Sequence, residues 1–332
     1  MVQKWPQDGM KFLHRPSVVR WSNGGFRVGL MVTWKSPRPG KNWFRTAVFD
    51  ADGSPLAVWR QSEEYCALDV PLLTPEHVWL GATQITESGG TIPAYVRTPY
   101  AELATTTSVL PFAVGNQGAL ANENTLAHFG LNGNSVTIFD AISNTAKTFG
   151  GSPYPEYKQP NPVADSALMR CYLAQAPPAA CIWNRSTHDV QPLLDKGAAA
   201  VADAKSDGET LVWIQAPGTE QPDGSYPPGD IWTSPFVTTA SAVVPKKRRP
   251  APKVRHPAAI ANAGYYAFAS GYDGLVHVYR LSDMRHWSFE HAPNWTPPFD
   301  VAYVDAQEVW FGHSTGIARQ HLDALGPGDP PP

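Results

Sequence analysis

Hydrophobic and polar residues alternate most regularly between residues 258 and 290, AAIANAGYYAFASGYDGLVHVYRLSDMRHWSFE. This segment divides into a small-residue stretch at 258–262, an aromatic stretch at 265–270, and alternating stretches at 275–280 and 285–290. Period-two alternation bounded by Gly, Asp and Ser indicates antiparallel strands, and the Asp-Gly pair at 273–274 is a strong hairpin signal. The segment therefore predicts one complete unit of four antiparallel strands.

The aromatic stretch of this unit recurs along the chain, with starts that are 42 to 55 residues apart. The comparable stretches lie at residues 28–34, 77–82, 126–131, 168–173, 210–215 and 308–313. Most are flanked by strand-like segments on both sides. A four-stranded unit that repeats every ~40–50 residues is typical of a β-propeller blade. The pattern predicts an all-β fold, a single seven-bladed β-propeller of four-stranded antiparallel blades.

The predicted blades fall at approximately residues 17–60, 67–107, 109–150, 161–194, 199–244, 257–290 and 298–325. The seventh unit lacks a fourth strand, and we expect residues 10–14 to supply it. An N-terminal strand in that place would close the ring and remove two open sheet edges. No linker divides the chain, and the tail 326–332, GPGDPPP, is expected to be disordered.

Short motifs in these units resemble those of known propeller repeats. Residues 273–283 and 134–149 resemble the inner part of a WD40-type repeat, although Phe139-Asp140 and Tyr279-Arg280 stand where that repeat has Trp-Asp. Residues 206–214, together with 229–234, are similar to TolB-type repeats. The resemblance implies the β-propeller superfamily, with degenerate repeats, and no particular protein.

Composition limits the classes of partner. Of 332 residues, 42% are hydrophobic and only 17% are charged, and the net charge of −3 gives no field that would attract nucleic acid or a membrane surface. No run of 18 apolar residues predicts a membrane span, and the N-terminus lacks the apolar core of a signal peptide. We therefore expect a soluble protein, cytoplasmic unless a secretion signal has been removed.

The three cysteines, Cys66, Cys171 and Cys181, form no metal-binding motif. Cys171 and Cys181 fall on strands that we expect to pair, so they can approach each other. An odd and low number of cysteines nevertheless favours buried free thiols over a disulfide framework.

The long irregular segments share one predicted face. In a propeller, loops that join the second to the third strand of a blade emerge on the same face as loops between blades. The long segments of both kinds are 35–43, 83–92, 151–161, 216–229 and 245–257. Because binding residues concentrate on long loops held by a rigid scaffold, this long-loop face is the predicted site.

Cationic and aromatic side chains on these loops suit contact with a protein, since Arg, Tyr and Trp dominate binding energy at interfaces. The predicted partner-binding residues are Arg38, Lys41, Trp43, Tyr154, Tyr157, Tyr226, Lys246, Lys247, Arg248, Arg249, Lys253 and Arg255. The basic run at 246–255 is either an arm that contacts acidic protein, phosphate or nucleic acid, or a proline-stiffened solvated connector. The slight overall acidity favours the connector.

Polar residues recur after the first strand of successive units: Asn122, Asp165, Asp203, Asn262 and Asp305. They are interpreted as turn residues, whose side chains bond to their own backbone, in preference to a metal-binding ring at the channel mouth. The sequence contains no nucleophile elbow, phosphate loop, dinucleotide fingerprint or metal-ligand spacing. It predicts no catalytic residue, cofactor or metal.

The leading functional hypothesis is a non-catalytic scaffold or adaptor that binds a protein partner through the long-loop face. The alternatives are a propeller hydrolase or lyase with a site at the channel mouth, and a carbohydrate-binding lectin. Titratable groups with shifted pKa values at the channel mouth would favour an enzyme. The sequence does not indicate the oligomeric state.

Overall fold

The structure is a computed structural model whose description covers most of the chain. It describes residues 2–4, 11–12, 17–20, 25–35, 42–50, 54–60, 65–66, 71–85, 91–103, 119–129, 135–150, 156–172, 177–194, 199–255, 258–270, 272–290, 301–313 and 316–331. Within them the fold is built of strands and three short 3-10 helices. Among these residues no helix is long and apolar enough to cross a membrane.

The described strands form seven sheets of four or five strands and one sheet of two. The first sheet contains β2 (Lys11–Phe12), β3 (Ser17–Arg20), β4 (Phe26–Lys35), β5 (Asn42–Phe49) and β6 (Pro55–Arg60). The second contains β7 (Tyr65–Cys66), β8 (Leu72–Leu73), β9 (His77–Ile85) and β10 (Thr91–Pro99), which is followed by the 3-10 helix η1 (Tyr100–Glu102). The third contains β11 (Ala119–Ala121), β12 (Thr125–Phe129), β13 (Ser135–Asp140) and β14 (Thr145–Gly150).

The next three sheets each contain four strands in chain order. The fourth contains β15 (Glu156–Val163), β16 (Ser166–Tyr172), β17 (Ala179–Asn184) and β18 (Asp189–Leu194). The fifth contains β19 (Ala199–Ser206), β20 (Thr210–Pro217), β22 (Gly229–Pro235) and β23 (Lys246–Ala251). The sixth contains β25 (Ala258–Asn262), β26 (Tyr265–Ala269), β27 (Leu275–Arg280) and β28 (His286–Glu290).

The seventh sheet joins the two ends of the chain. It contains β29 (Val301–Val304), β30 (Glu308–His313), β31 (Gly316–His321) and β1 (Val2–Lys4), and β31 leads into η3 (Asp323–Leu325). The two-stranded sheet pairs β21 (Ser225–Tyr226) with β24 (Val254–Arg255). The recurring strands expected from the sequence overlap β4, β9, β12, β16, β20, β26 and β30 and are confirmed as strands.

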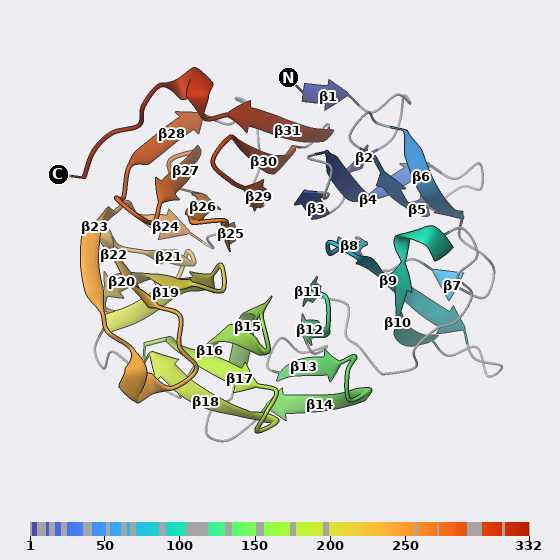
Figure 1. Cartoon of the computed structure of the whole chain (residues 1–332), viewed down its shortest axis with the longest axis horizontal. Helices are drawn as coiled ribbons and strands as arrows, with labels where there is room; N and C mark the ends of the chain where they lie inside the picture. The colour runs from blue at the N-terminus through green and yellow to red at the C-terminus, as the bar shows by residue number, and fades with distance from the viewer. Residues whose placement is uncertain are drawn as a thin grey trace.

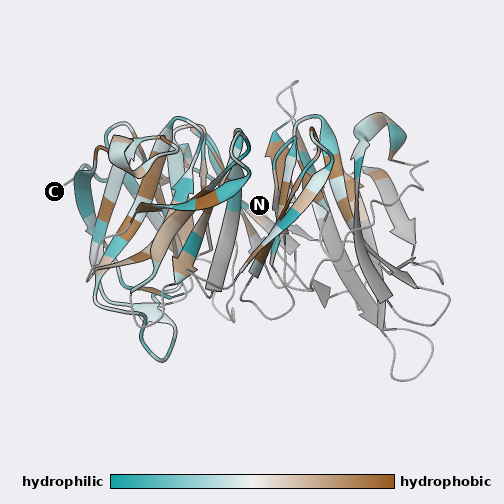
Figure 2. Cartoon of the chain, turned by 90° about the horizontal axis from the view of Figure 1, so that it is seen from below, coloured by the Kyte–Doolittle hydropathy of each residue, from teal (hydrophilic) through white to brown (hydrophobic). Residues whose placement is uncertain are grey.

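The seven larger sheets surround a common centre (Figure 1). The strands nearest the centre are β3, β8, β11, β15, β19, β25 and β29. Each contacts the next one in this order, and β29 contacts β3. Apolar side chains fill the space between neighbouring sheets, so the core consists of separate clusters such as Leu72, Trp79, Leu126 and Phe139 between the second and third sheets. Hydrophilic residues gather in the turns (Figure 2).

The N-terminal segment differs from the sequence expectation. Strand β1, residues 2–4, pairs with β31 in the seventh sheet, with Val2 opposite Ala318. Residues 11–12, which we expected beside the seventh unit, form β2 and pair with β4 of the first sheet instead. The prediction for residues 10–14 is therefore wrong. Two short strands precede β3, and the earlier one, β1, is the strand that pairs with β31.

The outer strand of the fifth sheet also differs. The fifth unit, expected at residues 199–244, should end with its outer strand, but residues 240–244 contain the 3-10 helix η2 (Ala240–Ala242). The outer strand is β23, which pairs with β22 and carries the basic run. An edge strand tolerates both Pro250 and exposed lysines, because its outward backbone groups need no partner and its charges discourage further pairing. This strand was not predicted because its charged residues and proline do not show the alternation of hydrophobic and polar positions.

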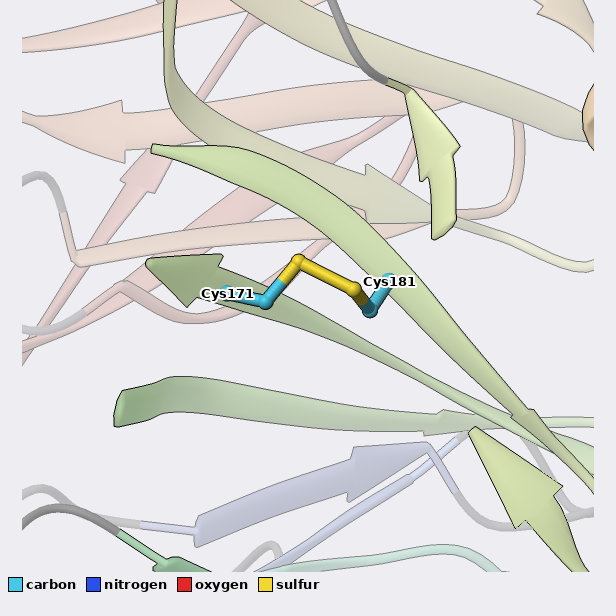
Figure 3. The surroundings of a disulfide bond; sticks show 2 residues. All are labelled: Cys171 and Cys181. Carbon is cyan, nitrogen blue, oxygen red and sulfur yellow. A yellow bond between two sulfur atoms is a disulfide. The ribbon is translucent and has the colours of Figure 1, made fainter. Parts of the chain in front are cut away.

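The two cysteines of the fourth sheet form a disulfide (Figure 3). Met169 lies opposite Cys181 and Cys171 opposite Ala179, so the cysteines are diagonal neighbours with Cα atoms 5.9 Å apart. This separation lies within the usual range for a disulfide. The expectation of free thiols is wrong for Cys171 and Cys181, because cross-strand placement outweighs the low cysteine number.

Candidate interaction site

Two long segments of the predicted face meet through β21 and β24. Ser225 pairs with Arg255 and Tyr226 with Val254, so the connection from β20 to β22 lies against the connection from β23 to β25. A further bridge joins Ala199 to Gly218. The sequence expectation that these two loops emerge on the same face is confirmed by this pairing.

The loop before β21 is closed by its own hydrogen bonds. The Gln221 amide donates to the Ser225 carbonyl over 2.8 Å, and the Gly224 amide donates to the Gln221 carbonyl over 2.8 Å. The Asp223 carboxylate accepts from the Ser225 amide over 3.0 Å and from its hydroxyl over 2.6 Å. These bonds from Ser225 lower the pKa of Asp223, with a smaller contribution from Lys253 and Arg255.

Tyr226 anchors the loop to the protein interior. Its side chain is 0% exposed, and its hydroxyl accepts from Arg170 and donates to Glu220. Arg170, on β16 of the fourth sheet, is 3% exposed and also donates to the Tyr172 hydroxyl. The prediction that Tyr226 offers contact area to a partner is wrong: the ring belongs to the core and holds the loop in place.

A second buried polar group lies near this anchor, since the Asp203 carboxylate interacts electrostatically with Arg170. Tyr266 donates to Asp203 over 2.8 Å, and Lys205 lies 3.1 Å from the other oxygen of the same carboxylate. Burial raises the pKa values of Tyr226 and Tyr266 well above the usual value for tyrosine, so both remain protonated donors. Buried hydrogen bonds between side chains, such as the one from Tyr266 to Asp203, make an arrangement rigid.

On the solvent side of the anchor lies a surface that we call the loop-face patch. It is defined as Glu220, Asp223, Lys253, Arg255 and Tyr272. Tyr272 is 58% exposed, and the Lys253 ammonium lies 4.1 Å from the centre of its ring. Arg255 and Asp223 are exposed, whereas Lys253 and Glu220 are half-buried. The patch therefore combines positive and negative side chains with one large aromatic ring, on loops whose backbone is fixed by hydrogen bonds.

Tyr272 is a residue that the sequence analysis missed. It lies in the turn between β26 and β27, before Asp273-Gly274. Turn chemistry accounts for the Asp and the Gly but does not require a large aromatic residue beside them. That mismatch is the signal by which Tyr272 could have been found.

Other predicted contact residues lie on β23, away from the patch. Arg248 donates to the Ser282 carbonyl over 3.0 Å, and Arg249 donates to the Met284 carbonyl over 2.8 Å. Lys247 pairs with Asp230 over 2.8 Å, and Lys246 is exposed. The expectation of a basic loop is thus wrong for residues 246–251, because they form an outer strand whose arginines bind the neighbouring sheet.

Two of the remaining predicted residues lie in strands: Trp43 in β5, opposite Trp34, and Tyr157 in β15, opposite Cys171. We had placed both in loops. Arg38, Lys41 and Tyr154 lie outside the described residues. Their part in the site stays a prediction.

The recurring Asn and Asp residues mainly serve turns and contacts between sheets. Asn122 accepts from the Asn124 and Thr125 amides, and its own amide donates to the Ala164 carbonyl of the next sheet over 2.9 Å. Asn262 donates in the same way to Val304 over 2.8 Å. Asp305 accepts from two turn amides, which supports the turn interpretation. Asp203 differs, since it is buried within β19.

One group of described residues has the composition of a metal site: Glu76, His77 and Glu123, whose ligand atoms lie within 4.8 Å of one another. His77 Nδ1 lies 2.9 Å from the Glu123 carboxylate. The Arg97 guanidinium lies 3.2 Å from the same His77 nitrogen and 3.9 Å from Glu123. Because a cation already neutralises the carboxylate, the group is an ion-pair cluster between the second and third sheets.

A second titratable group lies in the sixth sheet. His277 lies 2.9 Å from Asp273 and 3.0 Å from His286, and the two imidazole rings stack. Burial, followed by the neighbouring His277 and Arg249, lowers the pKa of His286 to about 3. His286 is therefore neutral at neutral pH.

Comparison with known proteins finds no matching protein-family model and no matching curated protein. Solved structures do match. Uncomplexed acylaminoacyl peptidase from Pyrococcus horikoshii has a TM-score of 0.59 at 12% identity, covering 94% of this chain and 52% of that one. The β-propeller domain of the Trilobed protease from Pyrococcus furiosus has a TM-score of 0.53 at 11% identity, covering 98% of each chain.

A third match is the β-propeller domain of Myceliophteria thermophila Cps50 (Swd1), with a TM-score of 0.55, 10% identity, and coverage of 96% of this chain and 98% of that one. The present chain spans about half the length of the acylaminoacyl peptidase. At these identities the likeness concerns the fold alone. The chain therefore has a β-propeller fold, as the sequence motifs led us to expect.

Proposed function

We propose that this chain is a non-catalytic scaffold that binds a partner protein through the loop-face patch. The observation that carries the proposal is the pairing of β21 with β24 over the buried Tyr226 anchor. It gives two long connections one fixed conformation and leaves Lys253, Arg255 and Tyr272 at the surface. A surface that is ordered before binding loses little conformational entropy when a partner docks.

The chemistry of the patch supports a protein partner. Tyr and Arg are enriched among residues that dominate protein–protein binding energy, and a rigid aromatic ring contributes area at low entropic cost. Both signs of charge occur within the patch, in Asp223 and Arg255. A mixed patch fits a protein surface better than it fits the uniformly negative backbone of a nucleic acid.

The test compares two double variants that change the charge by the same amount. Lys253→Glu with Arg255→Glu alters the loop-face patch, whereas Lys246→Glu with Lys247→Glu alters the β23 edge. The purified chains capture partners from the native host at low and moderate salt, followed by mass spectrometry. We expect a stoichiometric partner to be lost with the first pair and kept with the second. Equal capture by both variants, or equal loss, would reject the patch.

One observation favours a second candidate function, a propeller hydrolase or lyase. The Asp273, His277 and His286 side chains form a hydrogen-bonded row, and His286 has a strongly lowered pKa. Shifted histidines are common in active sites. The hydrogen bonds that these two rings make with Asp273 and with each other lie inside this row, which also fits a packing role. Turnover of a hydrolase substrate panel that is lost in His277→Gln would favour the enzyme.

For the architecture, we infer that the seven larger sheets are seven blades and that β1 closes the ring as the outer strand of the seventh. The closed order of contacts among the innermost strands supports this inference. So does the pairing of β1 with β31, which joins both ends of the described chain in one sheet. Deleting residues 2–4 should lower the melting temperature, because β31 then loses the outer strand that pairs with it. An unchanged melting curve would argue against closure through β1.

A further inference from the structure

The C-terminal segment packs along the outer edge of the sixth sheet. Figure 1 shows it running outside β28 after η3. The His286 amide donates to the Asp329 carbonyl over 3.0 Å, and the Asp329 amide donates to the His286 carbonyl over 2.8 Å. This differs from the disordered tail expected from the sequence. The two bonds form an antiparallel bridge on the side of β28 that faces away from β27.

Side chains of the β28 edge add further contacts to the tail. The Trp287 indole donates to the Gly326 carbonyl over 2.9 Å, and Arg285 donates to the Pro327 carbonyl over 2.9 Å and to the Gly328 carbonyl over 3.4 Å. All these bonds use the backbone of residues 326–329. The edge therefore binds the backbone of an extended chain and not its side chains, as in strand addition to a sheet edge.

One position of the tail is restricted to glycine. A Cβ atom added to Gly328 would lie 2.5 Å from Cε2 of Trp287, and the residue has a φ of +73°. Pro327 fits because only its carbonyl is used. The edge thus selects an extended segment with glycine over the indole ring, and it tolerates proline before that glycine.

We propose that the outer edge of β28, formed by Arg285, His286 and Trp287, is a binding site for an extended glycine- and proline-rich segment of a partner protein. In this structure residues 326–331 of the same chain occupy the site. This site lies on the outer rim and does not depend on the loop-face patch. The tail follows η3 and β31 without a long linker, so its effective concentration at the edge is high. A partner segment binds when the tail is displaced.

The test uses the full chain with Gly328→Asn, which drives the tail away from Trp287 while β28 stays unchanged. The probe is a fluorescent peptide of residues 323–331, DALGPGDPP, and the matched peptide is DALGPNDPP. We expect the first peptide to bind the variant at least about tenfold more tightly than it binds the unaltered chain, because the tail no longer competes. The matched peptide should not bind the variant.

Hydrogen exchange locates the binding. In the variant the His286 amide should exchange rapidly, and DALGPGDPP, but not DALGPNDPP, should slow it. Failure of the first peptide to bind, or equal binding of both peptides, would overturn the proposal. A dimer of the unaltered chain that is lost in Gly328→Asn would also overturn it, since a second copy would then be the occupant.

Two controls keep the result interpretable. Gly264→Asn makes the same substitution at a φ of +79° where an added Cβ meets nothing within 4 Å, and so reports the cost of backbone strain alone. If Gly328→Asn does not fold, Asp329→Pro replaces it. This second variant removes the Asp329 amide that bonds to His286 and leaves β28 intact. The same peptides and the same outcomes then apply.

Discussion

The two halves of the basic run, residues 246–249 and 253–255, have the same residue types but different surroundings. In the first half Arg248 and Arg249 donate to backbone carbonyls of the next sheet, at Ser282 and Met284. In the second half Arg255 is exposed, and Lys253 lies over the ring of Tyr272 in the loop-face patch. The first half mainly joins sheets, whereas the second half presents its charge to solvent.

This difference shows that a run of positive charge has no single meaning. A guanidinium carries five donors, so it can satisfy carbonyls that end a turn as readily as it can bind an anion. Which use prevails depends on whether the residue lies on a strand that packs against a neighbouring turn. The sequence alone does not contain that information.

The largest expected effect comes from Tyr226, the buried anchor that pairs with Val254 of the second half. Tyr226→Ala removes a fully buried ring and should lower the free energy of unfolding by about 3–5 kcal/mol. Tyr226→Phe keeps the ring and should cost about 1–2 kcal/mol, because it leaves Arg170 and Glu220 without the hydroxyl. Urea unfolding measures both. A loss below about 1 kcal/mol for the alanine variant would show that the loops are not anchored through this ring.

Arg249 and Arg255 provide the direct comparison of the two halves. Arg249→Ala should lower the free energy of unfolding by about 1–2 kcal/mol, since it removes a charged hydrogen bond to Met284 and the contact with the Tyr279 ring. Arg255→Ala should change it by less than about 0.5 kcal/mol, because the residue is exposed. Equal losses in urea unfolding would remove the distinction between the halves.

Acidity should test the packing around Arg249. The pKa of His286 is about 3 in the folded chain, against 6.5 for an unperturbed histidine. Below about pH 6.5 His286 binds a proton in the unfolded state but not in the folded state. The free energy of unfolding therefore falls as the pH falls toward 3. Because one proton is taken up, the slope cannot exceed about 1.4 kcal/mol per pH unit, and solvent screening of the half-buried ring reduces the total loss.

The groups that face this ring are His277, Tyr279, Asp273 and Arg249. His286→Phe keeps the stacking and should flatten the decline in melting temperature between pH 7 and pH 5. The Lys253→Glu and Arg255→Glu pair should leave that decline as in the unaltered chain. A decline that persists in His286→Phe would assign the effect to another group.

The smallest effect is expected at the exposed lysines of β23. Lys246→Ala should change the free energy of unfolding by less than about 0.5 kcal/mol, as is usual for a solvated surface residue. Lys247→Ala should cost at most about 1 kcal/mol through its exposed pair with Asp230. Larger losses would mean that the strand depends on these charges and would blur the comparison with Arg249.

The sequence predicted the recurring strands because alternation depends only on which face of a sheet is buried. It missed β23, where lysine and proline replace the alternating pattern at an edge. It placed Tyr226 at the surface because loop residues are usually exposed, whereas the pairing of β21 with β24 buries this one. The disulfide and the docked tail depend on the strand register and on the fit of Gly328 against Trp287, which no local pattern encodes.

The central claim is that a partner docks on the loop-face patch and not on β23. The most direct measurement is hydrogen exchange of the chain alone and with its captured partner, read segment by segment. The account predicts slowed exchange at residues 217–228, 252–255 and 272–274, with exchange at 246–251 unchanged. Protection confined to residues 246–251, or absent from the loops, would contradict it.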